Sequence, residues 1–362
     1  MRNQQISLLE SLVKIPGPSG FEEKIADFIK RELLKYLPPS CVKVDFQNNV
    51  VGIIKGTSNK VIMLDAHLDQ IGFIVSNVSN DEGKKGLISI QYIGGGDTSI
   101  LSARELVILA AKNNINAVVN RKHSHLVDDE DEIQITKMRD AVVDIGIRNR
   151  AKVLSSVKIG DPVVYKSSFN HLMESYFSGY GFDDRSGCYI LLEIIKEIVK
   201  SKQKPIPTLV FVFSSQEEVY GNKCKPLLKK YHPDLFIELD VTFATDCGTD
   251  EFLDTEVGLC ELNKGLVLYR GVGIDKEYTK LMESTARSNK IKIQFQASGG
   301  QIGYTTDYVS SEEKGIHVLI MGIPLRNMHS PTEIINLNDL NNGALLLTRF
   351  LQNKNIVAPL EK

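Results

Sequence analysis

The sequence TLVFVFSSQEE, residues Thr208 to Glu218, decides the first prediction of the fold. It runs through five apolar residues, Leu209 to Phe213, and ends at two adjacent carboxylates, Glu217 and Glu218. A continuous run of β-branched and aromatic residues is typical of a strand that is covered on both faces of a parallel sheet. Ligands and catalytic groups gather beyond the carboxyl ends of such strands. We therefore expect the glutamate pair to take part in chemistry.

The composition limits the class of protein. The chain has 362 residues, of which 42% are hydrophobic, so it can bury a sizeable core. Because it is longer than one ordinary domain, we expect two domains. The net charge of −2 gives no basis for a nucleic-acid or membrane-surface partner. Five cysteines without CxxC spacing argue against a disulfide framework and a thiolate zinc site, and favour a reducing compartment. With no signal-peptide pattern and no apolar segment of membrane-spanning length, the expected location is the cytoplasm.

A second buried strand is predicted at Val61 to Leu64, within KVIMLDAHLDQIGFIV. It delivers His67 and Asp69, which lie two residues apart and point to the same side of an extended backbone. Asp69 could then bind one nitrogen of the His67 imidazole and orient the ring, so that the other ring nitrogen faces a metal. An HxD triplet alone is frequent by chance, but its place at a strand end favours a site. Upstream, Ser19 with Glu22 three residues later predicts a capping box for a helix.

The segment from about Ile71 to Ser167 has a different pattern. Short runs of alternating apolar residues are separated by Gly, Asn and Asp clusters, which predicts a small β-barrel or sandwich inserted into the first domain. Gly94-Gly95-Gly96 is expected to be a turn, because no helix with Lys-Ser/Thr follows it as in a phosphate-binding loop. The predicted strands are 71–78, 87–92, 105–110, 117–119, 141–145 and 162–165.

Three further polar groups lie next to the ends of predicted core elements. Asp183 and Asp184 precede a helix with an apolar face, where a helix cap is an equally good explanation. A buried strand from Leu235 to Leu239 ends at Asp240, and a strand from His317 to Met321 is followed by a loop that contains His329. A closing helix, Leu337 to Leu351, is expected to begin from a capping Asn336.

Together these residues form a candidate metal set. The ends of four buried strands and one helix start carry His67, Asp183, Glu217 or Glu218, Asp240 and His329. Imidazole and carboxylate ligands without thiolate suit zinc or cobalt, with manganese as an alternative. Five ligands fit two metal ions that share a bridging carboxylate. A dinuclear hydrolase also needs one carboxylate that is not a ligand, and adjacent glutamates on an extended backbone would supply both kinds.

In this order, PGPSGFE, AHLDQIGFIV, FDDRSGC, QEEV, LDVTFATD and GIPLRNMHSPTEI resemble the M42 family of dinuclear metallo-aminopeptidases, the glutamyl or TET group. The resemblance covers nearly the whole chain. It implies a zinc-exopeptidase-like α/β domain with a doubly wound mixed sheet, residues 1–70 and 168–362, interrupted by a small β-barrel dimerisation domain, residues 71–167. It also implies a homo-oligomer, from a dimer up to a tetrahedral dodecamer.

The resemblance assigns roles to the site residues. His67, Asp183 and Asp240 would hold one metal ion, and Asp183, Glu218 and His329 the other, with Asp183 as the bridge. Glu217 would be the general base that activates a bridging water for hydrolysis of the amino-terminal residue of a peptide, and Asp69 would orient His67. Related two-zinc exopeptidases also have a cis peptide bond after the bridging aspartate, which we predict between Asp183 and Asp184.

Three positions depart from the family pattern, and three other functions remain open. Gln70 replaces a glutamate, Tyr220 intervenes before a glycine, and a lysine is missing from the residues before Asp183. The alternatives are a deacylase or amidohydrolase that acts on a non-peptide amide, an endoglucanase-type glycoside hydrolase, and a non-catalytic assembly protein. Adjacent glutamates cannot readily stand on opposite faces of a glycosidic bond, which argues against the glycosidase.

Overall fold

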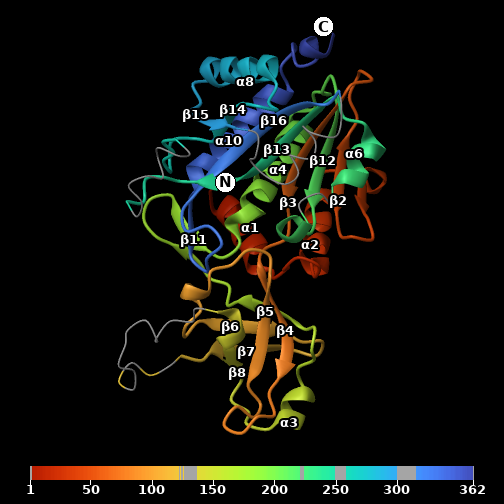
Figure 1. Ribbon diagram of the computed structural model, residues 1–362. Helices are drawn as coiled ribbons and strands as arrows, with labels where there is room; N and C mark the ends of the chain where they lie inside the picture. Colours follow the sequence, from red (N-terminus) through yellow and green to blue (C-terminus); the bar gives the residue numbers. More distant parts are fainter. Residues whose placement is uncertain are drawn as a thin grey trace.

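The computed structural model describes residues 2–121, 123, 125, 137–220, 224–248, 258–299 and 315–361. The chain forms a large mixed sheet flanked by helices and, below it in Figure 1, a separate small barrel. The barrel strands lie in the sequence between the strand that carries His67 and the helix that begins at Phe182. The predicted α/β domain with an inserted barrel is therefore confirmed. Its boundaries at residues 71 and 167 stay a prediction.

Among the described residues, eight strands form the central sheet. Strands β12, β3, β13 and β16 run parallel to one another, while β2 pairs antiparallel with β12, and β14 with β16. The carboxyl ends of the four parallel strands therefore meet at one edge of the sheet. The strand order is β1 (Val42–Val44), β2 (Val50–Ile54), β12 (Thr208–Ser214), β3 (Val61–His67), β13 (Leu235–Phe243), β16 (His317–Leu325), β14 (Val267–Gly271) and β15 (Gln294–Ser298).

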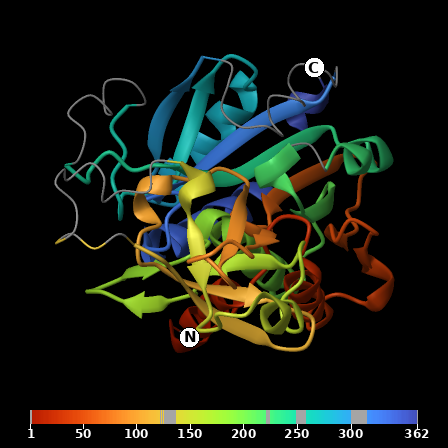
Figure 2. The same ribbon diagram turned by 60° about the horizontal axis from the view of Figure 1, so that its bottom comes forward.

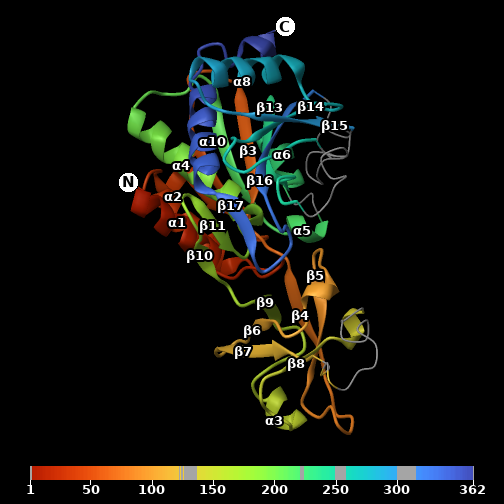
Figure 3. The ribbon, with the colours of Figure 1, turned by 90° about the vertical axis from the view of Figure 1, so that its left-hand side faces the viewer.

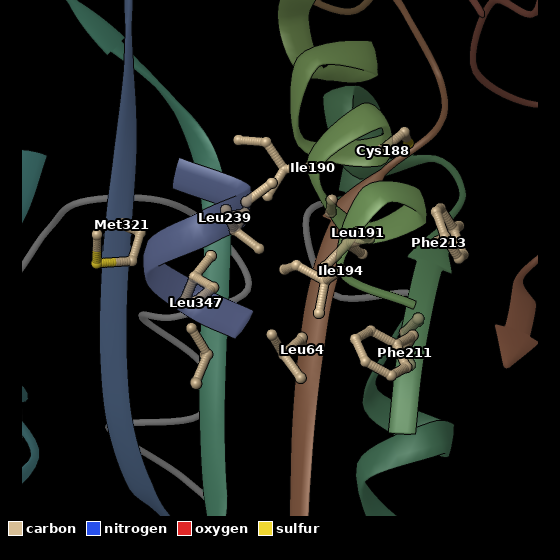
Figure 4. Packing of buried hydrophobic residues seen from close by; sticks show 14 of the residues in the cluster. Leu64, Cys188, Ile190, Leu191, Ile194, Phe211, Phe213, Leu239, Met321 and Leu347 are labelled. Atoms are coloured by element: carbon tan, nitrogen blue, oxygen red, sulfur yellow. The ribbon is translucent and has the colours of Figure 1, made fainter. Parts of the chain in front are cut away.

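Helices cover both faces of this sheet. Figure 3 shows α4 and α10 on one side of the strands and α6 on the other. In the close view of Figure 4, Leu64 of β3 lies beside Leu191 and Ile194 of α4, and all three are fully buried. Each such side chain stabilises the fold by roughly 1.5–3 kcal/mol. The longer helices are α1 (Arg2–Lys14), α2 (Glu23–Leu34), α4 (Phe182–Ser201), α6 (Lys225–Tyr231), α8 (Lys276–Ser288) and α10 (Leu337–Leu351).

The run Leu209 to Phe213 lies in β12, between β2 and β3. Each residue of the run is at most 1% exposed. The prediction of a strand covered on both faces is confirmed, because successive residues point to opposite faces of the sheet and all of them are buried.

The inserted domain is a closed barrel with its own core. Its strands follow one another as β4 (Gly72–Val78), β5 (Ile88–Ile93), β8 (Val142–Asp144), β7 (Asn114–Val119), β6 (Glu105–Leu109) and β9 (Pro162–Tyr165). Phe73, Leu106 and Val163 are fully buried among themselves and their neighbours, in a cluster separate from that of the central sheet. Figure 2 brings this barrel to the front of the view. The alternating runs found in the sequence correspond closely to these strands.

A small antiparallel sheet pairs two strands that follow the barrel in the sequence with a strand close to the C-terminus. It consists of β10 (Phe169–His171), β11 (Tyr176–Gly179) and β17 (Glu333–Asn336), and it pairs Gly179 with Glu333. The structure also describes the short helical segments η1 (Pro39–Cys41), η2 (Thr98–Ile100), η5 (Met138–Asp140), α3 (Arg150–Leu154), α5 (Glu217–Tyr220) and η6 (Ala358–Glu361).

One predicted helix cap is confirmed and another is wrong. Helix α10 begins at Leu337, and the Asn336 side chain accepts the Asn338 N–H as its cap. The capping box from Ser19 to Glu22 does not form. Ser19 Oγ instead donates to Asp69 Oδ2 at 2.6 Å, a partner that is distant in the sequence. In the part of the chain that the structure describes, no helix has both the length and the apolar character needed to cross a bilayer.

Candidate metal centre

The side chains predicted as metal ligands meet at the carboxyl edge of the central sheet. His67 is the last residue of β3, and His329 lies in the loop after β16. Asp240 lies in β13, Asp183 at the start of α4 and Glu218 in α5. Five elements that are far apart in the sequence thus contribute to one site.

The strand that carries Asp240 is longer than predicted. It was expected to end at this residue, but β13 continues to Phe243. The extension has a clear cause, because Val241, Thr242 and Phe243 pair in register with β16. Asp240 is therefore fixed within a strand rather than in a loop.

The two oxygens of Asp183 face different imidazoles. Oδ1 lies 3.0 Å from His67 Nε2, and Oδ2 lies 3.2 Å from His329 Nε2. Asp240 Oδ1 is 3.8 Å from His67 Nε2, and Glu218 Oε2 is 3.3 Å from His329 Nε2. We call the first group the His67 half-site (His67, Asp183, Asp240) and the second the His329 half-site (Asp183, Glu218, His329). The two half-sites share one carboxylate.

The donor atoms of these half-sites suit divalent metal ions. One ligand atom each from His67, Asp183 and Glu218 lie within 4.8 Å of one another. Imidazole nitrogen and carboxylate oxygen are the donors that zinc, cobalt and manganese accept in proteins. Within the described part of the chain, the buried Glu218 Oε1 has no hydrogen-bond partner, which leaves an acceptor for a cation. The residues present therefore fit the metal ions that the sequence predicts.

The electrostatics of the site favour added positive charge. Burial raises the pKa of Asp240 to about 7, and the charge of Asp183 acts in the same direction against the opposing His67. Burial also raises the pKa of Glu218. Burial acts in the same sense on Asp183, but hydrogen bonds with His329 and His67 outweigh it and hold the pKa of Asp183 below its usual range. Positive charge near Asp183 thus stabilises its carboxylate.

Asp69 supports two parts of the site. Its Oδ1 accepts the Glu217 N–H at 3.0 Å, and its Oδ2 accepts the Glu218 N–H at 3.2 Å. Its Oδ1 also lies 3.5 Å from His67 Nδ1, the ring nitrogen that faces away from Asp183. Asp69 was predicted from its spacing to His67, but its bonds to the start of α5 were not, because they join residues far apart in the chain.

The glutamate pair lies on a helix rather than on an extended backbone. Glu217 and Glu218 open α5, so that prediction is wrong in its local geometry. The two side chains still point in different directions, because consecutive positions on a helix are roughly 100° apart. Glu218 faces His329, while Glu217 Oε2 lies 4.0 Å from His67 Nε2. Burial raises the pKa of Glu217 to about 9, although His67 opposes this shift.

Sequence reasoning missed a contribution from the barrel. The loop after β5 passes beside the His329 half-site, where a Cβ at Gly95 would lie 3.0 Å from His329 Nδ1. A Cβ at Gly94 would lie 3.2 Å from the Cβ of Glu218. The glycine run predicted only a turn, since the lack of side chains gives no sign of what the backbone approaches.

Two departures from the family pattern have different surroundings. Gln70 is only 2% exposed, and its Oε1 accepts the Gly17 N–H at 3.1 Å, so it belongs to the internal framework. Tyr220, the last residue of α5, is 60% exposed.

The peptide bond between Asp183 and Asp184 is cis, as predicted.

Over most of its length, the chain is similar to known aminopeptidases. The family model for M42 glutamyl aminopeptidase matches residues 48–346, which is most of the chain. A protein of Acetivibrio thermocellus that carries an aminopeptidase name is 30% identical over 347 residues, which cover 95% of this chain and 97% of that protein. The lysyl aminopeptidase of Pyrococcus furiosus is 26% identical over 95% of this chain and 96% of its own length.

A solved structure supports the same conclusion. The Pyrococcus horikoshii TET1 peptidase, described as able to assemble into a tetrahedron or a large octahedral shell, is 28% identical to this chain. Its fold superposes with a TM-score of 0.83 and covers 96% of this chain and 99% of that one. The chain therefore belongs to the M42 family and is a metallo-aminopeptidase, a peptide hydrolase.

Proposed function

We propose that this aminopeptidase releases amino-terminal residues from peptides with two divalent metal ions, one in each half-site, and with Glu217 as the general base. The observation that carries the proposal is Asp183, whose two oxygens face His67 and His329 at 3.0 and 3.2 Å. A shared carboxylate between two imidazoles is the arrangement that two neighbouring ions need. Zinc or cobalt would fit this ligand set best, with manganese as an alternative.

The chain itself supplies proton transfer and positioning. When bound, the metal ions would contribute Lewis-acid chemistry, which lowers the pKa of a water and polarises a carbonyl. Glu217 would take the proton of the attacking water and give it to the leaving amine nitrogen. Its side chain is 13% exposed and lies beside the His67 half-site, which suits a group that exchanges a proton within a sheltered site.

The geometry gives no support to a glycoside hydrolase. Such enzymes place two carboxyl groups on either side of the scissile bond. Glu217 and Glu218 instead follow one another on a single short helix, and Glu218 lies 3.3 Å from His329. A glycosidase would leave both imidazoles without a role.

We predict that hydrolysis depends on metal. Protein stripped with a chelator should lose activity on aminoacyl-anilides and short peptides, and added zinc, cobalt or manganese should restore it. A panel of aminoacyl groups with each metal would also give the preferred amino-terminal residue. An N-acylated amino acid amide tests the alternative of a deacylase. Full activity after complete metal removal would contradict the proposal.

The two glutamates should respond differently to substitution. Glu217→Gln should leave both metal ions bound and lower kcat by roughly 10²- to 10⁴-fold, because the general base is lost. Glu218→Ala should weaken binding of one ion, because it removes a ligand of the His329 half-site. Metal content and kcat are measured for both, with Glu197→Gln on the exposed face of α4 as the control. Equal loss of metal in Glu217→Gln and Glu218→Ala would refute this division of roles.

Gly95→Ala should disturb the His329 half-site from the barrel side. The new methyl group would lie 3.0 Å from His329 Nδ1, so the imidazole or the loop has to move. We expect weaker binding of one metal ion and a lower rate, with circular dichroism unchanged. A competition titration against a chromophoric chelator measures the affinity. Wild-type affinity for both ions in a folded variant would show that the loop yields instead of His329.

We also propose that the barrel mediates self-association. Val118 and Ile159 are apolar residues of the barrel domain that are 44% and 59% exposed. The related TET1 peptidase can assemble into a tetrahedron or a large octahedral shell. Light scattering after gel filtration should therefore give a dimer or a larger assembly, up to twelve subunits. Ile159→Asp should shift the mass toward the monomer. A monomeric wild-type protein at micromolar concentration would rule out this proposal.

A further inference from the structure

Glu333 is a buried carboxylate that neither the ligand set nor the general base uses. It opens β17 and is 2% exposed. Its Oε2 accepts the N–H groups of Gly181 and Phe182 at 3.0 and 2.7 Å, and that of Asp183 at 3.4 Å. Its Oε1 accepts the N–H of His329 at 3.2 Å. One side chain thus holds the backbone of two residues that the metal site requires.

The first set of bonds fixes the turn that leads into α4. Gly181 has a left-handed φ of 84°, and Asp183 and Asp184 have non-helical backbone angles, so the regular part of α4 begins after them. At that point Asp184 Oδ1 accepts the Gly187 N–H at 2.9 Å. The N–H groups of the turn itself are accepted by Glu333, which belongs to another element. Glu333 therefore fixes the turn from which Asp183 projects.

The second bond fixes a residue in an uncommon conformation. His329 has a φ of 59°, a left-handed value that residues other than glycine rarely adopt. Its loop contains no strand or helix at this point, so the bond from its N–H to Glu333 restrains it directly. The two oxygens of one carboxylate are rigidly connected. The bonds to Asp183 and His329 therefore set the relative position of these two residues.

We propose that Glu333 is a positioning residue that presets the distance between Asp183 and His329 and so assembles the His329 half-site before metal binds. This inference rests on the proposed function only in taking Asp183 and His329 as ligands of one ion. The ligands of a metal site bind tightly when their own hydrogen bonds hold them in place, and loss of such bonds typically lowers affinity roughly 10- to 100-fold. Glu333 acts through the backbone, without contact to substrate.

Glu333→Gln is the decisive substitution, because the glutamine side chain has nearly the same volume as the glutamate side chain. A glutamine has one acceptor oxygen, so it can keep the bonds to α4 or the bond to His329, but not both. We expect one of the two ions to bind at least 10-fold more weakly, while the other, in the His67 half-site, changes less. Excess metal should recover much of kcat with little change in KM.

Asp339→Asn is the matched control. Asp339 is also a buried carboxylate, 1% exposed, and it accepts the N–H groups of Asn263 and Gly265, which are not part of the site. Loss of these bonds should lower the unfolding midpoint without changing metal affinity. The readouts are two-site metal titration of the stripped protein and thermal unfolding without metal, for the wild type and both variants.

The outcomes separate the hypotheses. Selective loss of one ion in Glu333→Gln, with no larger change in the unfolding midpoint than in Asp339→Asn, supports the positioning role. Wild-type affinity for both ions, or equal loss of affinity in both variants, overturns it. If Glu333→Gln does not fold, Glu333→Asp decides by the same criterion, since it keeps the charge but withdraws it by one methylene. A wild type that binds two ions but cleaves no peptide contradicts the proposed function alone.

Discussion

Acidic side chains crowd around His67 and His329, and the rest of the site depends on this electrostatic constraint. Asp183 is buried, Glu218 and Asp240 beside it are partly buried, and burial raises the pKa of the last two. Carboxylates so close together in a low-dielectric interior remain ionised only when positive charge lies among them. Imidazoles that act as neutral ligands cannot provide that charge. Divalent cations satisfy the whole set, because they attract the carboxylates and accept the imidazole nitrogens together.

Mutual repulsion would spread these groups if their loops were free to move. Several of the bonds that oppose it run from backbone N–H groups to a second set of buried carboxylates. The Asp69 carboxylate accepts the N–H of Glu217, and the Glu22 carboxylate accepts that of Gln216 at 3.2 Å. The Glu333 carboxylate accepts the N–H of His329. These bonds fix the direction from which each side chain projects. The candidate site thus combines acids proposed as metal ligands with acids that hold the backbone.

The sequence was sufficient for features that depend on local pattern. The apolar run Leu209 to Phe213 indicated a central strand. The rule that sites lie beyond strand ends predicted that the candidate ligands meet at one edge of the sheet. Local rules failed where a residue's partner is distant. Ser19 has the right neighbour for a capping box, but Asp69 takes its hydroxyl. The strand through Asp240 continues because β16 pairs with it, which no feature of the strand itself reveals.

The approach of the barrel to the metal centre was the hardest feature to foresee, and it has the widest consequence. Gly95 has no side chain that would mark it in the sequence as part of a site, yet its position limits the space beside His329. The barrel has a core of its own, separate from that of the sheet domain. The loop that contains Gly95 follows barrel strand β5, so the packing of the barrel sets the place of this loop beside the imidazole. The surroundings of His329 are therefore built by both domains, and a local pattern in either one is not enough to reveal them.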